Sequence, residues 1–277
     1  MNSFRKILLT AVFGLAVGAV SAQSPEDSTI FAKSRWNEVF REEGITVRKC
    51  AVRLFNSDQQ IVCMEIDPQL YRFAVVQDSL REKVSKLAKK HKADAAINGG
   101  FFKVRTPLAI AVGYIQIDRD SVPQLTGNYN GAVAIDTDGQ VSVISWSKKM
   151  EVDSAYGGLF PDILTAGPLL IDQGRVLPKW DETEPRHPRS CIGTRTDGNI
   201  MLLVVDGRQK NADGMALCEL ARIARWMGMT QALNLDGGGS SALWSKQKGV
   251  VNSPCDKGLF SRKERKVCNA ITVTKRK

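Results

Sequence analysis

The most constraining feature of this sequence is an apolar stretch that runs directly into three consecutive glycines, within residues 232–244. The stretch predicts a strand, and because strand side chains alternate between faces, Asn234 and Asp236 lie on one face. The turn that follows offers a cradle for anionic oxygens, built from Gly237, Gly238, Gly239, Ser240 and Ser241. A nucleotide P-loop is excluded because its Gly-Lys-Ser/Thr ending is absent, and a Gly-x-Ser-x-Gly nucleophile elbow is excluded too. A purely structural glycine turn is the alternative, but it leaves a buried Asn/Asp pair unexplained.

The rest of the chain predicts many short strands and few helices. Strands are expected at 45–54, 60–66, 93–97 and 200–205, with a series of antiparallel strands and turns over 108–176. Ser79 and Glu82 have the spacing of a capping box before apolar residues at helical intervals, which predicts an amphipathic helix over 79–91. A second helix is expected over 216–227. This order favours an α+β domain with a mainly antiparallel curved sheet packed around a few helices.

The N-terminus has the features of a secretory signal peptide over residues 1–22, with a basic start at Arg5 and Lys6, an apolar run and a small-residue ending. No later stretch is long and apolar enough to span a membrane. Residues 23–43 are expected to be a polar lead-in, either mobile or a short helix, and 44–277 a single domain. We therefore expect an exported monomer, periplasmic or extracellular.

Export makes disulfides the expected use of the six cysteines. Their spacing favours the pairs Cys50 with Cys63 and Cys255 with Cys268, which leaves Cys191 with Cys218. None has the close spacing of a zinc site, so no metal site is expected. The formal net charge of +10 favours acidic partners such as phosphorylated glycans. Nucleic acid is disfavoured because the basic residues are scattered and no aromatic-rich binding motif accompanies them.

Several further segments place polar or glycine residues at the ends of predicted strands. Their candidate binding residues are Asn98, Gly99, Gly100, Phe101, Thr165, Gly167, His187, Arg189 and Arg208. Glycines let backbone N–H groups approach a ligand closely, and two arginines can form forked contacts to a phosphate. Asp206 ends the most apolar strand and is placed like a catalytic carboxylate. Each segment alone is equally compatible with an ordinary turn beside the core.

Taken together, these segments resemble the phosphodiester glycosidase domain family. The matching runs lie in the family's order over roughly residues 93–275: Asn98-Gly99-Gly100-Phe101, Ala166-Gly167-Pro168, Pro188-Arg189-Ser190, Val205-Asp206-Gly207-Arg208, Gly214-Met215-Ala216-Leu217 and Asn234 to Ser241. Cys191 and Cys218 depart from the family's pattern, and so does a basic loop near the end of the chain. The resemblance implies a hydrolase that acts on the bond between an anomeric carbon and a phosphate, with the substrate left open.

A sugar phosphate leaves as a stabilised anion, so its hydrolysis needs a general acid less than an ordinary glycoside does. The site then needs a carboxylate to activate water or attack the anomeric carbon, and cations to hold the phosphate. Asp236 or Asp206 is the candidate carboxylate, and Arg189 and Arg208 are the candidate cations. The expected substrate is a glycosyl phosphodiester similar to a GlcNAc-1-phosphate diester.

No cofactor is expected, although Asp and Asn oxygens make a bound Ca²⁺ conceivable; no standard calcium loop indicates one. Two other functions fit the same residues. A non-catalytic module could bind anionic glycans with the arginines and glycines alone. A phosphodiesterase would break the P–O bond instead, and the lack of a histidine-rich site counts against a metal-dependent one.

Overall fold

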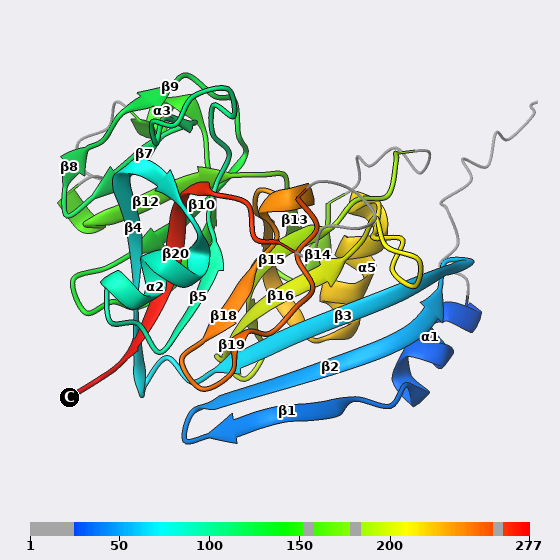
Figure 1. Ribbon diagram of the computed structural model, residues 1–277. Coiled ribbons are helices and arrows are strands. Elements are labelled where there is room, and N and C mark those ends of the chain that lie inside the picture. Colours follow the sequence, from blue (N-terminus) through cyan, green and yellow to red (C-terminus); the bar gives the residue numbers. More distant parts are fainter. Residues whose placement is uncertain (1–24, 152–157, 178–183, 257–262) are drawn as a thin grey trace, which may run out of the picture.

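The computed structural model describes residues 25–151, 158–177, 184–256 and 263–277, in which short strands dominate and pair almost entirely antiparallel (Figure 1). The predicted signal peptide, residues 1–22, lies outside the described residues. The α+β prediction is confirmed, and the strands are divided among three large sheets and one two-stranded sheet.

The largest sheet has eight strands and carries most of the candidate site. In spatial order it contains β1 (Asn37–Glu42), β2 (Ile45–Leu54), β3 (Ser57–Ile66), β16 (Ile200–Asp206), β15 (Arg189–Arg195), β17 (Met229–Asn234), β13 (Leu169–Asp172) and β14 (Arg175–Val176). Strand β16 is buried along its whole length. Ile200, Leu202 and Val204 face the main core, whereas Met201 and Leu203 face a second core on the other side. Two apolar faces explain the uninterrupted apolar run in the sequence.

Two five-stranded sheets complete the main core. One contains β11 (Val141–Ser145), β10 (Gly131–Ile135), β12 (Asp162–Ala166), β7 (Ile115–Ile117) and β8 (Asp120–Ser121). The other contains β19 (Gly249–Val250), β18 (Leu243–Ser245), β5 (Ala95–Asn98), β20 (Val267–Lys275) and β4 (Tyr71–Glu82). The short strands β6 (Ala111–Val112) and β9 (Gln124–Leu125) pair in parallel. The main core draws residues from all three large sheets.

Helix α5 (Leu217–Trp226) confirms the helix predicted over 216–227. It covers the second core of the large sheet with Leu220, Ala221 and Ala224 buried, as its apolar spacing indicates. A four-residue helix, α3 (Lys148–Glu151), follows β11.

The helix predicted over 79–91 is shorter than expected, because α2 spans only Val84–Lys90. The capping-box pattern is wrong here: residues 79–82 continue β4, where Glu82 pairs with Val267 of β20. Leu80, expected on the buried face of the helix, is 53% exposed. The helix begins instead where Glu264 accepts hydrogen bonds from the backbone N–H and hydroxyl of Ser85.

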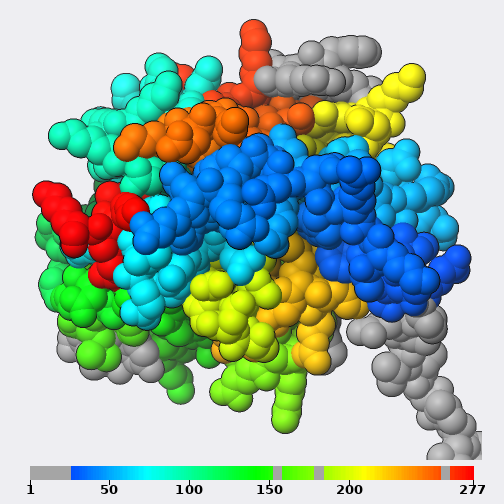
Figure 2. All heavy atoms as spheres, turned by 90° about the horizontal axis from the view of Figure 1, so that it is seen from below, coloured from blue at the N-terminus to red at the C-terminus, as the bar shows by residue number. Residues whose placement is uncertain are grey.

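The segment predicted as a polar lead-in contains helix α1 (Pro25–Lys33) and strand β1. Phe31 of α1 lies 5.9 Å from Trp36 and 5.5 Å from Trp226, measured between ring centroids. Figure 2 shows α1, β1 and β2, in blue, spread across one face of the molecule. Aromatic packing therefore fixes a segment in which the sequence shows little pattern.

The three predicted disulfides are not formed, and no disulfide joins any of the six cysteines, all of which lie in the described residues. Cys50 stands opposite Ile61 in the β2–β3 pair, so Cys63 is its diagonal neighbour. Diagonal partners are roughly 7–8 Å apart, which is too far for a disulfide. The Cys268 thiol donates to Gln77 Oε1 at 3.2 Å, and the Cys255 thiol donates to the Arg208 carbonyl at 3.7 Å.

Among the described helices, none combines the length and apolarity that a membrane crossing requires.

Candidate active site

The predicted binding residue Asn98 ties three segments together at the end of β5. Its side chain is fully buried, and its Nδ2 donates to the Asp236 carbonyl at 2.7 Å. Its Oδ1 accepts from the Ser190 hydroxyl at 2.7 Å and from the Ala242 N–H at 3.2 Å. Asn98 therefore holds the Asp236 turn in place.

Asn234 ties the end of β17 to the segment between β12 and β13. Its Nδ2 donates to the Gly167 carbonyl at 2.7 Å, and its backbone N–H donates to the Pro168 carbonyl at 3.1 Å. Its Oδ1 is buried without a hydrogen-bond partner in the protein. The predicted Gly167 is thus brought to the site, whereas the Thr165 hydroxyl donates to the Tyr114 carbonyl.

Asp236 is the partly exposed carboxylate at the centre of this arrangement. Its Oδ1 accepts from the N–H of the next residue, Gly237, at 2.9 Å. Burial raises the pKa of Asp236 to about 6, against the lowering effects of the Ser240 hydroxyl, the Arg265 guanidinium and that N–H. A carboxylate with this pKa is ionised at neutral pH and close to the range that suits a general base.

Two arginines cover the glycine turn that follows Asp236. A Cβ placed on Gly238 would lie 3.2 Å from Nη2 of Arg208, and one placed on Gly239 would lie 2.6 Å from Nη2 of Arg265. Gly238 also has a φ of +61°, which favours glycine. The triple glycine therefore lets two guanidinium groups approach the backbone beside Asp236.

The glycine turn offers an anion fewer N–H donors than the sequence predicts, because most of its N–H groups already donate within the protein. Gly238 N–H donates to the Pro188 carbonyl at 2.7 Å, and the N–H groups of Ser240 and Ser241 donate back into the turn at 3.2 and 3.3 Å. The Ser241 hydroxyl is buried without a partner in the protein. Charge for holding an anion therefore comes from the arginines.

The two predicted phosphate-binding arginines have different surroundings. Arg208 is exposed, and its Nη2 lies 3.2 Å from Nδ1 of His187. Burial, together with the charges of Arg208 and Arg189, lowers the pKa of His187. Arg189 is buried, donates to the Met215 carbonyl at 2.8 Å and pairs with Glu184 at 2.9 Å. The geometry therefore makes Arg265, which the sequence did not single out, the second arginine of the turn.

Asp206, the other candidate carboxylate, is buried and is held by structural partners. It is 5% exposed, and its Oδ1 accepts from Asn252 Nδ2 at 2.9 Å. The Ser253 N–H lies 3.0 Å from both of its carboxylate oxygens. Burial raises its pKa, and these donors oppose the rise. Asn252 also donates to the Ser241 carbonyl at 3.1 Å, so this network supports the glycine turn from behind.

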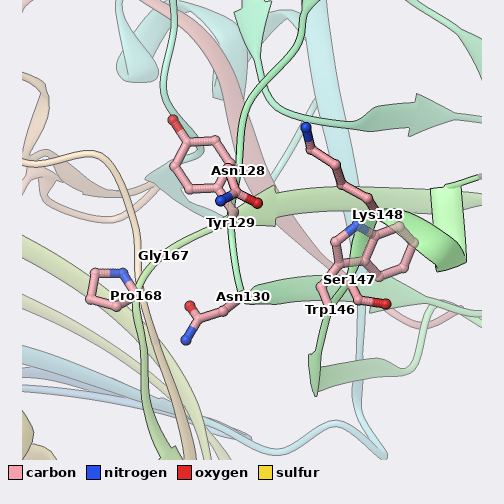
Figure 3. Close-up of a pocket in the computed structure, with 8 residues that line it drawn as sticks. All are labelled: Asn128, Tyr129, Asn130, Trp146, Ser147, Lys148, Gly167 and Pro168. Carbon is pink, nitrogen blue, oxygen red and sulfur yellow. The ribbon is translucent and has the colours of Figure 1, made fainter. Parts of the chain in front are cut away.

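A cavity of about 690 Å³ opens beside the Asn234–Gly167 contact. Figure 3 shows its lining: Asn128, Tyr129, Asn130, Trp146, Ser147, Lys148, Gly167 and Pro168. These residues come from the chain entering β10, the chain leaving β11 and the link between β12 and β13. Two stacked aromatic pairs border it: Phe101 with Tyr129 at 5.1 Å, and Tyr114 with Trp146 at 5.6 Å. Aromatic side chains with a few placed polar groups are the usual lining of a small-molecule binding site.

Tyr129 of this cavity lies within the electrostatic influence of Asp236. Burial raises the pKa of Tyr129 to about 12, and the charge of Asp236 contributes to the rise. A Cβ placed on Gly113 or Gly127 would lie within 2.7 Å of the Tyr129 ring, so both glycines are needed to seat it. The predicted Phe101 thus acts through its stack on Tyr129.

The predicted Gly99 and Gly100 pack against Asn269 of β20. Gly100 N–H donates to Asn269 Oδ1 at 2.8 Å, and Gly99 N–H donates to the Asn269 carbonyl at 3.0 Å. The Asn269 Nδ2 is buried and has no partner in the protein. Both glycine amides are therefore used in the fold.

Sequence reasoning missed Tyr129, Trp146, Arg265, Asn252 and Asn269. One signal was available for Tyr129, which lies in the run Gly-Asn-Tyr-Asn-Gly at residues 127–131. An aromatic flanked by amides and glycines is typical of a ligand-facing loop. Within the described residues, no group of three or more His, Cys, Asp or Glu side chains is placed to hold a metal ion.

The family model for phosphodiester glycosidases matches residues 91–274. The chain belongs to the phosphodiester glycosidase family. A Bacillus subtilis prophage-derived uncharacterized protein, YomE, is 27% identical over 76% of this chain and 32% of its own length. The mouse N-acetylglucosamine-1-phosphodiester alpha-N-acetylglucosaminidase is 28% identical over 53% of this chain and 30% of its own length. The match thus spans about a third of each of these relatives.

The solved structures show the same fold. The catalytic domain of the zebrafish N-acetylglucosamine-1-phosphodiester alpha-N-acetylglucosaminidase, auto-inhibited by its pro-peptide, superposes with a TM-score of 0.69 at 20% identity. The superposition covers 88% of each chain. Membership of the phosphodiester glycosidase family supports a phosphodiester glycosidase-like function for this chain.

Proposed function

We propose that this chain is a hydrolase that breaks the C1–O bond of a glycosyl phosphodiester. One observation carries the proposal: the segment around Asp236 joins the two halves of the site. Asn234 donates to the carbonyl of Gly167, which lines the aromatic, amide-containing cavity, and Arg208 and Arg265 lie over Gly238 and Gly239. The cavity suits a sugar ring, and the two guanidinium groups suit a phosphate. The family's description and the names of the mammalian relatives agree with this substrate class.

In this proposal Asp236 is the general base. It takes a proton from a water molecule, whose oxygen forms the new bond to C1 as the C1–O bond to the phosphate breaks. Arg208 and Arg265 stabilise the phosphomonoester anion as it leaves, so no strong general acid is needed. Asp206 supports the turn through Asn252 and takes no part in proton transfer.

The test is hydrolysis of an alkyl diester of GlcNAc-1-phosphate in ¹⁸O-labelled water, with Asp236→Asn as the matched control. The label is read in the phosphomonoester, because its oxygens do not exchange with water as those of a reducing sugar do. An unlabelled phosphomonoester supports C1–O cleavage, and a labelled one identifies a phosphodiesterase. No turnover of this or other glycosyl phosphodiesters, with binding retained, would identify a glycan-binding module.

We also propose that residues 1–22 direct export, and that the mature protein acts as a monomer outside the cytoplasm. The basic start, apolar run and small-residue ending support this proposal. Mass spectrometry of the protein from the extracellular or periplasmic fraction should give a chain beginning at Gln23, and size-exclusion chromatography should give the monomer mass. A cytoplasmic protein that retains Met1 contradicts export.

A further inference from the structure

Arg265, which lies over Gly239 of the glycine turn, also lines a second cavity of about 470 Å³. It is lined by Arg81, Val104, Asp256, Arg265 and Lys266. The end of β4 and the start of β20 meet there, since Glu82 pairs with Val267. Pairing of these two strands therefore brings Arg81 into one cavity with Arg265 and Lys266, which are far from it in the sequence.

The positive charges in this lining are only partly balanced. Asp256 pairs with Arg265 at 2.6 Å. Lys266 lies 4.0 Å from Glu82, which is also 3.4 Å from Lys86. Two lysines thus share one carboxylate outside the cavity lining.

Arg81 has the least compensation. Its Cζ lies 5.5 Å from the centre of the Phe102 ring, and its Nε is buried without a hydrogen-bond partner. Among the described residues, no acidic side chain forms an ion pair with it. Arg81 also lines the cavity, so an anion bound there would supply the counter-charge that this guanidinium lacks.

Arg265 belongs to both places. It lies over Gly239 of the turn and lowers the pKa of Asp236, and it also lines the second cavity. An anion bound in this cavity would therefore sit beside the phosphate held at the turn. The first cavity, by contrast, is lined by two aromatic and two amide side chains and has Lys148 as its one cation, a lining that suits a glycan ring.

We propose that the second cavity is an anion subsite that binds a further phosphate carried by the leaving group. The substrate class is then a polyanionic glycosyl phosphodiester, in which the phosphate at C1 is followed by another phosphate along the chain. This inference rests on the function proposed above, because it places the leaving group at the arginine-covered side of Asp236.

The first experiment compares kcat/KM for two synthetic diesters of GlcNAc-1-phosphate, one with a neutral alcohol as leaving group and one whose alcohol carries a second phosphate. We expect the second to be favoured by about tenfold or more, from the added charge-assisted hydrogen bonds. Lys266→Gln and Arg81→Gln should reduce this ratio to below about threefold, and the ratio should shrink with added salt.

The control is Lys86→Gln, which removes the same charge next to Glu82 but does not line the cavity. It should leave the ratio unchanged. Equal kcat/KM for the two substrates in the unmodified protein, or an equal loss in Lys86→Gln, overturns the proposal.

A binding measurement separates this inference from the proposed function. Isothermal titration of tripolyphosphate into the purified protein should show affinity that falls about fivefold or more in Lys266→Gln, whose side chain is exposed and whose loss spares the fold. If neither diester is turned over but this fall is seen, the hydrolase proposal fails and the anion subsite stands. Equal affinity in Lys266→Gln and Lys86→Gln overturns the subsite.

Discussion

Two Asp-Gly pairs lie at the ends of β16 and β17, the strands on either side of β15 in the large sheet, and their surroundings differ. Asp206 ends β16, and its carboxylate oxygens accept from Asn252 and Ser253. Asp236 follows β17, and its carboxylate accepts from its own neighbour Gly237 and lies near Arg265. Both carboxylates are desolvated and both pKa values are raised, so burial alone does not separate their roles. The separation comes from where the carboxylates lie: the donors to Asp206 belong to Asn252 and Ser253, which support the turn from behind, whereas Asp236 is partly exposed beside the two arginines that cover the turn.

The largest expected effect is on turnover when Asp236 is replaced. Asp236→Asn keeps the size of the side chain but removes the base, so kcat should fall by about 10³-fold. Steady-state hydrolysis of a glycosyl phosphodiester measures this fall. The matched variant Asp206→Asn should lose less than about tenfold, and near-normal turnover by Asp236→Asn would remove the distinction between the two residues.

Replacing Asp206 should affect stability most. Asp206→Ala leaves the Asn252 amide and the Ser253 N–H without their acceptor in a buried region, which should lower the free energy of unfolding by about 2–3 kcal/mol. Urea denaturation followed by circular dichroism measures the loss. A loss below about 0.5 kcal/mol would mean that water replaces the carboxylate, and that Asp206 is not a structural group.

The strands and the site segments were largely predictable, because they depend on local patterns. The apolar run of β16 follows from burial of both faces of that strand. The alternation in β2 follows from burial of one face. The capping-box pattern at Ser79 failed because pairing between β4 and β20, which are far apart in the sequence, overrode local helix propensity. The predicted disulfides failed for a related reason: cysteine spacing carries no information on strand register.

The roles of the individual site residues could not be predicted, since they depend on contacts between segments that are distant in the sequence. Arg189 and Arg265 look alike in the sequence, and each forms an ion pair, with Glu184 and Asp256 respectively. They differ in place: the Arg189 side chain is buried and donates to the Met215 carbonyl, whereas the Arg265 guanidinium lies over Gly239. Asn98 resembles a ligand-binding amide, yet all of its hydrogen bonds hold neighbouring segments. Only the fold shows which polar groups are used in holding the structure and which can still bind a ligand.

The same comparison predicts that Asp236→Asn stabilises the protein at alkaline pH. The pKa of Asp236 is about 6 in the folded state, against 3.8 as the ordinary value, so folding favours its neutral form. That contribution is complete below pH 3.8 and is lost as the pH rises through about 6. At pH 8 the neutral Asn variant should therefore be more stable by about 3 kcal/mol, and the difference should vanish near pH 3.5. Urea denaturation at both pH values measures it, and a variant that is less stable at pH 8 would show that the ionised carboxylate is favourably held.

The smallest effect concerns the acid limb of the pH–rate profile. If Asp236 must be ionised, kcat/KM should fall about tenfold per pH unit below a limb near pH 6. Arg265 lowers this pKa through its charge, so Arg265→Gln should move the limb upward by about half a unit.

Arg208→Gln removes the other arginine over the turn, which is not among the charges that act on the pKa of Asp236. The acid limb of the Arg208→Gln variant should stay near pH 6, although its kcat/KM falls. Equal shifts in both variants would mean that the pKa of Asp236 responds to the total charge around the turn and not to Arg265 in particular.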